Sequence, residues 1–174
     1  MKQKKRLNMK LNPLQKLRHN LQFILPTVFL FLWVSCRQDT LYHTYQSIPT
    51  PDGWHKQDTL SYQLPEQIEG EGYRLEVGIR NTNQYPFRDI WLSIRQNWKD
   101  SLVFQTDTLH FYLADEQGKW NSGGNTGSLF QHTYFCEKTF TIRPSSINIL
   151  QMTHLMKQDP LPGISDAGIR LVKP

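Results

Sequence analysis

Side chains able to bind a metal ion are scattered along this sequence. Ligands of a zinc site usually stand about two to four residues from one another. The five histidines that follow residue 36 show no such spacing: they are His43, His55, His110, His132 and His154. We therefore interpret them as surface or packed histidines and expect no metal site.

Carboxylates are equally dispersed. Hydrolysis of a glycosidic bond needs a defined pair of them about 5 to 10 Å apart, and no pair stands out from this sequence. Residues 123–127 form a Gly-rich stretch, but no Lys follows it as in a phosphate-binding loop. The sequence therefore predicts a protein without catalytic activity and without a cofactor.

Cys36 is the residue most readily assigned a chemical role. It follows the small residue Ser35 and the segment 21–34, which is mostly apolar and uncharged. That segment is shorter than the roughly 20 apolar residues of a membrane-spanning helix, so it indicates the core of a signal peptide. The order Ser35–Cys36 resembles the lipobox of bacterial lipoproteins, in which diacylglycerol alkylates the sulfur and the freed amine is then acylated. The alternative is an ordinary or uncleaved signal peptide in which Cys36 is incidental.

Lipidation at Cys36 would hold the chain at a membrane. Several acyl chains make such anchoring effectively permanent, because each buried CH₂ contributes about 0.8 kcal/mol. No Asp directly follows the cysteine in the segment 37–40. The absence of an Asp at this position resembles the sorting signals of outer-membrane lipoproteins. We therefore expect the anchor to lie in the outer membrane and the domain to face the periplasm.

The net charge of +5 does not indicate a nucleic-acid partner. Seven of the 20 Lys and Arg residues lie in the first 18 positions, where they form the basic head of a signal peptide. From Cys36 onward, 13 basic residues stand against 15 acidic ones, which gives a net charge of about −2. The basicity therefore belongs to the targeting segment.

Cys136 is the second of the two cysteines in the chain. If Cys36 is lipidated, Cys136 has no partner for an internal disulfide. It lies in an apolar stretch between Phe135 and Phe140, and free cysteines are among the residues most often buried. We expect a buried structural thiol.

Aromatic residues are the one enrichment that suggests a binding surface. Trp54, Trp91, Trp98 and Trp120 could stack on sugars or contact a protein, yet tryptophans in a small sandwich more often belong to the core. Trp91 falls out of phase with the apolar residues beside it, which places it on the face of its strand opposite the core. Both interpretations of the four tryptophans stay open.

The elements that must position these residues are predicted to be strands. Apolar and polar residues alternate over 73–80, 90–95, 109–113 and 140–142, and a last strand is expected at 169–172. Turn-forming residues separate these runs, and residues 145–157 fit either a helix or a strand. Short strands with turn signals and little helix predict an all-β fold, an antiparallel β-sandwich.

The expected organisation has three parts. Residues 1–35 form the signal peptide, and residues 36–53 form the lipidated N-terminus and a tether, because prolines and a glycine interrupt the segment 49–53. Residues 54–174 form the β-sandwich domain. A tether this short would keep the domain close to its membrane.

Four segments of the mature chain, together with the lipobox, resemble the GldH family of gliding-motility lipoproteins from Bacteroidetes. The segments are 53–58, 75–87, 120–127 and 156–169. The similarity spans nearly all of the mature chain. The closing segment 161–169 also resembles the last strands of jelly-roll domains, so we expect the sandwich to be jelly-roll-like.

The family resemblance implies a lipid-anchored, non-catalytic accessory protein of the machinery that couples gliding to type IX protein secretion. Its partners would be the membrane and other envelope lipoproteins or membrane proteins. Members of the family also occur in bacteria that do not glide. The likeness to jelly-roll domains keeps a second interpretation open, namely a carbohydrate-binding outer-membrane lipoprotein.

Overall fold

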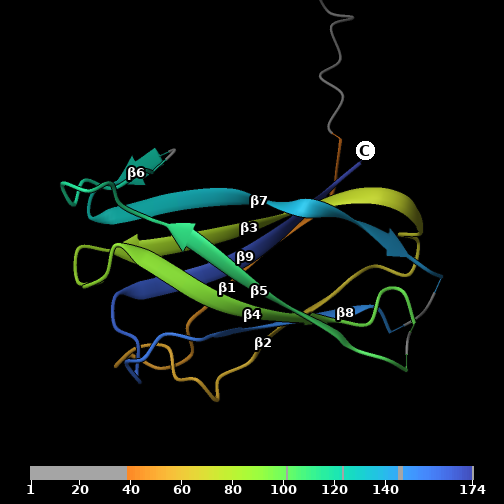
Figure 1. Ribbon diagram of the computed structural model, residues 1–174, viewed down its shortest axis with the longest axis horizontal. Coiled ribbons are helices and arrows are strands. Elements are labelled where there is room, and N and C mark those ends of the chain that lie inside the picture. Colours follow the sequence, from red (N-terminus) through yellow and green to blue (C-terminus); the bar gives the residue numbers. More distant parts are fainter. Residues whose placement is uncertain (1–38, 101, 123, 145–146, 174) are drawn as a thin grey trace, which may run out of the picture. The chain divides into compact units, whose positions relative to one another are not determined.

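The computed structural model of the protein describes residues 39–100, 102–122, 124–144 and 147–173. All regular structure in these residues is β-strand, as predicted (Figure 1). No described segment forms a helix with the length and apolar character needed to cross a membrane. The strands are β1 (Thr40–Ser47), β2 (Leu60–Gln63), β3 (Gly70–Thr82), β4 (Asp89–Gln96), β5 (Gln105–Tyr112), β6 (Gly124–Thr126), β7 (Leu129–Ile142), β8 (Ile149–His154) and β9 (Ile164–Val172).

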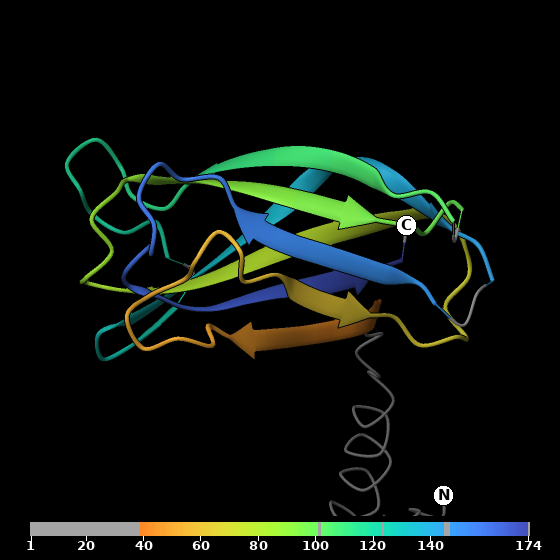
Figure 2. The same ribbon diagram turned by 90° about the horizontal axis from the view of Figure 1, so that it is seen from below.

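The strands form two antiparallel sheets that pack face to face (Figure 2). The larger sheet has the order β1-β9-β3-β7-β6, and the smaller one has the order β2-β8-β4-β5. The pairing is nested, since β1 pairs with β9, β2 with β8, β3 with β7 and β4 with β5. This arrangement is a jelly roll, so the predicted jelly-roll-like β-sandwich is confirmed.

Alternation of buried and exposed residues explains most of the strands. In β4, Ile90, Leu92 and Ile94 are fully buried, while Trp91 between them is 42% exposed. Side chains on successive strand residues point to opposite faces, so the outward position predicted for Trp91 is confirmed. The ambiguous segment 145–157 contains the strand β8, in which alternate residues from Leu150 onward are buried.

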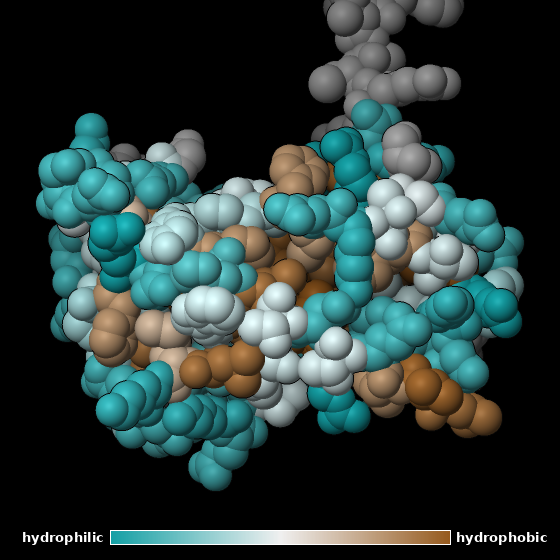
Figure 3. All heavy atoms as spheres, viewed as in Figure 1, coloured by the Kyte–Doolittle hydropathy of each residue, from teal (hydrophilic) through white to brown (hydrophobic). Residues whose placement is uncertain are grey.

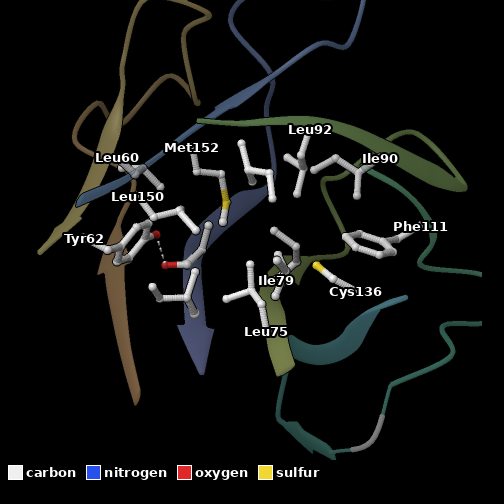
Figure 4. Close-up of a cluster of buried hydrophobic side chains, with 14 of the residues drawn as sticks. Leu60, Tyr62, Leu75, Ile79, Ile90, Leu92, Phe111, Cys136, Leu150 and Met152 are labelled. Carbon is white, nitrogen blue, oxygen red and sulfur yellow. Dashed lines mark hydrogen bonds between the residues drawn. The ribbon is translucent and has the colours of Figure 1, made fainter. Parts of the chain in front are cut away.

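Apolar side chains from both sheets fill the space between them (Figure 4). Leu75 comes from the larger sheet and Leu92 and Met152 from the smaller one, and all three are completely buried. Burying such a side chain contributes about 1.5 to 3 kcal/mol. Tyr62 spans the two layers, because its hydroxyl donates a hydrogen bond to the carbonyl of Ala167 at 2.8 Å.

The boundary predicted between tether and domain is wrong. Residues 40–47, expected to belong to the tether, form the edge strand β1, which pairs with β9 from Thr40↔Val172 to Ser47↔Asp166. The proline and glycine signals over 49–53 mark the connection from β1 to β2. The folded unit therefore begins at Asp39 and not at Trp54. The predicted signal peptide and residues 36–38 of the predicted tether, Cys36 included, lie outside the described residues.

The sandwich has two ends, which we call proximal and distal. At the proximal end the chain enters at Asp39, whose carbonyl accepts a hydrogen bond from the backbone N–H of Lys173 at 2.9 Å. The loops that join β2 to β3, β4 to β5 and β7 to β8 lie at this end, on the right of Figure 1. The distal end carries the connections from β1 to β2, β3 to β4, β5 to β6 and β8 to β9.

Candidate functional site

Two of the four candidate tryptophans belong to the core. Trp54 is 0% exposed and Trp98 is 1% exposed. The indole N–H of Trp54 donates to the carbonyl of Asp58 at 2.8 Å, and Trp98 packs edge-on against Phe140 with ring centroids 5.3 Å apart. The assignment of Trp54 and Trp98 to a binding surface is therefore wrong, because neither ring can reach a ligand outside the protein.

Trp120 covers the edge of the core at the distal end. It is half-buried, and its ring lies beside those of Tyr85 and Phe130. Its indole N–H donates to the side-chain oxygen of Asn83 at 3.1 Å. Trp120 thus holds the β3–β4 connection against the start of β7.

Trp91 is the one of the four that lies in a well-exposed position, on the outer face of the smaller sheet. It is opposite His110 in the β4–β5 register. The two rings stack with centroids 4.0 Å apart and planes inclined by 13°. Cross-strand neighbours in a sheet stand close enough for such pairs to form, so the hairpin itself positions the stack.

Asp89 fixes the geometry of this stack. One of its carboxylate oxygens, Oδ2, accepts a hydrogen bond from the Trp91 indole N–H at 3.2 Å. The same atom lies 2.7 Å from Nε2 of His110. A single carboxylate therefore ties the outer edges of both rings together on the surface.

Tyr112 and Arg88 extend the group along β5. Tyr112 is 50% exposed and packs edge-on against His110 with centroids 4.7 Å apart. The guanidinium carbon of Arg88 lies 5.2 Å from the centroid of the Tyr112 ring, within the range of a cation–π interaction. We call Arg88, Asp89, Trp91, His110 and Tyr112 the distal aromatic cluster.

The layers beneath hold the distal aromatic cluster in place. The backbone N–H of Trp91 donates to the sulfur of Met156 at 3.3 Å, and the N–H of Leu155 donates to the carbonyl of Trp91 at 2.8 Å. The hydroxyl of Tyr85 donates to the carbonyl of Asp89 at 2.7 Å. Burial raises the pKa of Tyr85 well above its ordinary value, so this hydroxyl stays a hydrogen-bond donor at all physiological pH values.

The segments that carry the family resemblance meet at the distal end. Trp54 and Leu161 exchange two backbone hydrogen bonds of 2.9 and 2.8 Å. Gly163 has φ +77°, and a Cβ there would lie 2.2 Å from the backbone nitrogen of Tyr85. Only glycine fits this close approach. These segments therefore form the backbone frame that supports the distal aromatic cluster.

A cavity of about 500 Å³ opens between the edges of β5 and β7. Cys136 lines it together with Phe111 and Phe140, and an ion pair between Lys138 and Asp107 bridges its rim. Burial raises the pKa of the Cys136 thiol to about 12. The predicted buried thiol is confirmed, and it is protonated at neutral pH, so it is a poor nucleophile.

The described surface carries side chains suited to binding. No group of three His, Cys, Asp or Glu side chains in the described part of the chain could hold a metal ion. Exposed Trp, Tyr and Arg side chains are the ones that most often dominate protein interfaces. The distal aromatic cluster contains one of each, held by hydrogen bonds and ring contacts.

Sequence reasoning identified Trp91 but missed Arg88, Asp89, His110 and Tyr112. The alternation in β5 does show that His110 and Tyr112 point away from the core. What the sequence does not reveal is the register, which places Asp89 opposite Tyr112 and Trp91 opposite His110. A shift of one residue would separate them.

Comparison with known proteins points to one family. The sequence model of the family described as "GldH lipoprotein" matches residues 40–171, from the start of β1 into β9. Similar proteins include the gliding motility lipoprotein GldH of Flavobacterium johnsoniae, 26% identical over 152 residues, or 85% of this chain and 92% of that protein. Another is the gliding motility lipoprotein GldH homolog of Christiangramia forsetii, 24% identical over 159 residues, or 84% of this chain and 95% of that protein.

Proposed function

Because the chain belongs to the GldH lipoprotein family, we propose that it is a non-catalytic accessory component of the gliding-motility and type IX secretion machinery. In this proposal Cys36 carries the lipid, the anchor lies in the outer membrane, and the domain faces the periplasm. The family itself is one of gliding-motility lipoproteins. The domain acts by binding other envelope proteins.

The observation that carries the proposal is the distal aromatic cluster. Its exposed Trp91 and Tyr112 rings and its half-buried His110 ring are held on the β4–β5 hairpin by mutual contacts, so little side-chain freedom is lost when a partner covers them. Trp91 is 42% exposed and Tyr112 is 50% exposed, and Leu155 beside them is 49% exposed. A contact patch with an apolar centre beside charged groups is the usual anatomy of a protein interface.

Confinement to a membrane strengthens such a contact. Two proteins held at one surface meet at a raised effective concentration, so a modest interface is enough to keep them associated. A lipidated Cys36 would therefore contribute to binding without touching the partner. Replacing Cys36 by Ser should weaken the association while the domain stays folded.

Carbohydrate binding is the second candidate, and the same cluster favours it. An exposed Trp beside a carboxylate can stack on a sugar ring and accept hydrogen bonds from its hydroxyls. Against this, one face of Trp91 is already covered by His110, and Trp54 and Trp98 add no further platform. We therefore rank protein binding first.

The test compares Trp91→Ala with Phe135→Ala in the full lipoprotein. Phe135 is an equally exposed aromatic residue, at 53%, but it lies on β7 in the other sheet. Crosslinking and pull-down from native envelopes should recover other gliding or secretion proteins with the wild type and with Phe135→Ala. Recovery should fall several-fold with Trp91→Ala.

Three results would contradict the proposal. Partner recovery unaffected by Trp91→Ala would exclude the distal aromatic cluster as the interface. Loss of polysaccharide binding in affinity electrophoresis with the same variant would favour the carbohydrate function. An intact N-terminus without acyl chains in the mass spectrum of the membrane-extracted protein would remove the anchor at Cys36.

A further inference from the structure

The proximal end carries the most exposed apolar side chains of the described residues. Leu102 is 91% exposed, and Val103 and Phe104, which follow it in the β4–β5 loop, are 56% and 36% exposed. Ile147, in the β7–β8 loop, is 56% exposed. Brown spheres project from the lower right of the molecule in Figure 3, where the β4–β5 loop turns back. We call Leu102, Val103 and Phe104 the apolar tip.

The apolar tip has a defined conformation. The side chain of Asp100 accepts a hydrogen bond from the N–H of Leu102 at 3.0 Å. The carbonyl of the same residue accepts one from the N–H of Val103, also at 3.0 Å. Both bonds tie Leu102 and Val103 back to Asp100, whose side chain commonly makes such local backbone contacts. The guanidinium of Arg95 lies 4.8 Å from the centre of the Phe104 ring, which supports the base of the apolar tip.

The chain enters the domain at the same end. Asp39 is fixed to β9 by the hydrogen bond from Lys173, and Thr40 is paired with Val172. Cys36 stands three residues before Asp39, and three residues span at most about 10 Å. A lipid-bearing Cys36 would therefore hold Asp39 near the bilayer surface whatever conformation the intervening residues adopt.

Strand pairing connects Asp39 to the apolar tip along the proximal end. β1, β9, β3 and β7 lie side by side, with neighbouring strands about 5 Å apart. The end of β7 then contacts the smaller sheet, because the N–H of Arg143 donates to the carbonyl of Trp98 at 2.9 Å. Trp98 lies in the loop that carries the apolar tip. Asp39 and the apolar tip therefore both lie at the proximal end, separated across the width of the sandwich.

We propose that the apolar tip inserts into the interfacial layer of the bilayer that holds the lipid anchor. This inference rests on the proposed lipidation of Cys36. Apolar groups at such surfaces are typically buried about 5 to 10 Å deep, at the boundary of headgroups and acyl chains. The lipoprotein then has two attachments, the acyl chains and the loop, which fix the orientation of the domain.

Apolar contact, and not charge, is the basis of the second attachment. The charged residues near the apolar tip in the sequence are Arg95, Lys99 and Asp100, with a net charge of only +1. Marked attraction to anionic lipids needs clusters of about four to eight basic residues. Insertion should therefore be similar in vesicles of neutral and of anionic lipids.

Insertion of the apolar tip would also orient the distal aromatic cluster. Trp91, Tyr112 and Leu155 lie at the distal end, so a domain resting on its proximal loops presents the distal aromatic cluster away from the membrane. A partner that binds there approaches from the aqueous side. The apolar tip and the distal aromatic cluster would thus have separate roles.

The experiment uses the lipidated protein in vesicles of phosphatidylethanolamine and phosphatidylglycerol that contain a nitroxide-labelled lipid. A polarity-sensitive fluorophore is attached in turn to Leu102→Cys and to Leu155→Cys. These are matched positions, since both are exposed leucines at opposite ends of the sandwich. Cys136 does not compete for the label, because it is buried and its pKa is raised to about 12.

We expect the nitroxide to quench the probe at position 102 several-fold more than the probe at position 155. A protein that floats with the vesicles but shows no quenching at position 102 overturns the insertion and leaves the lipid anchor intact. A protein that stays in the aqueous phase overturns both. Protection of position 102 by a copurifying protein, with quenching appearing only after that protein is removed, also overturns the proposal, because a partner then covers the apolar tip.

Discussion

Trp91 and Trp98 are seven residues apart, yet they have opposite environments. Trp91 lies within β4, where alternation places it on the outer face of the sheet, whereas Trp98 lies in the loop after β4 and is buried. The sequence pattern correctly placed Trp91. It could not assign Trp54 or Trp98, because both lie outside the alternating runs, where the period-two argument does not apply.

Replacing the two tryptophans should separate their roles. We expect Trp98→Ala to lower the free energy of unfolding by about 3 to 5 kcal/mol, since it leaves a large cavity. Trp91→Ala should cost less than about 1 kcal/mol, as is usual for exposed positions. Trp98→Phe is the control, because it keeps a ring and removes an indole N–H that has no hydrogen-bond partner among the described residues. Urea unfolding measures all three, and equal losses at positions 91 and 98 would contradict the assignment.

Two buried histidines make stability depend on pH. Burial lowers the pKa of His132 and of His154 below the ordinary value of 6.5. The charge of Asp159 partly opposes the lowering of the His154 pKa, whereas Lys56 and His55 lower this pKa further. The unfolded chain therefore binds protons at a higher pH than the folded chain. Their contribution to stability is complete above about pH 6.5 and is lost as the pH falls toward the folded-state pKa values.

We expect the unfolding free energy to decrease as the pH is lowered from about 7 to about 5. His154→Gln should make that decrease shallower, because the substituted side chain does not titrate. His43→Gln, at an exposed position of β1, should leave it unchanged. Thermal unfolding across this pH range measures the effect, and stability that is constant or rises toward acid pH would be inconsistent with buried neutral histidines.

Among the elements, β1 shows where sequence patterns fail. Its burial pattern has no strict alternation, because the strand lies at the edge of its sheet and most of its side chains are half-buried. Alternation signals a strand with one buried face and one solvated face. β4 meets that condition, and β3 alternates apolar and polar residues although its middle is buried on both faces. Both were predicted, whereas β1 was assigned to the tether. The nearby prolines and glycine were correctly recognised as a break, but they lie after β1 and not before the domain.

Two glycines determine how closely β1 can lie against its sheet. Gly78 and Gly168 are paired across β3 and β9, and the ring of Tyr45 from β1 lies over both. A Cβ on Gly168 would lie 2.6 Å from the backbone oxygen of Thr44. A Cβ on Gly78 would meet only the outer atoms of the Tyr45 ring, nearest at 2.0 Å, and that ring can rotate away.

We therefore expect Gly168→Ala to destabilise the protein more than Gly78→Ala, by about 1 to 3 kcal/mol. The first variant must move the backbone of β1, and the second loses chiefly the contact between Tyr45 and Arg80, whose guanidinium lies 3.9 Å from the ring centre. Hydrogen exchange of the β1 amides should rise in Gly168→Ala. Equal protection of β1 in the two variants would show that the glycine pair does not control its docking.

For the molecule as a whole, the nested pairing makes the C-terminal strand essential. β9 lies between β1 and β3 and pairs with both along its length. Deleting residues 164–174 should abolish cooperative thermal unfolding. Among the described residues, β1 loses the one strand with which it pairs, and β3 loses one of its two partner strands. Deleting residues 173–174 alone removes no strand and serves as the control. A cooperative transition in the longer deletion would mean that the sandwich tolerates the loss of a central strand.

The position of β9 also sets the order of events for a chain that must cross a membrane before it folds. Export proceeds from the N-terminus, so the last strand to arrive is the one that occupies the middle of the larger sheet. Until it arrives, β1 lacks the strand with which it pairs in the described residues, so the larger sheet cannot close. Folding would then follow only when translocation is complete. The topology itself thus delays the closing of the domain.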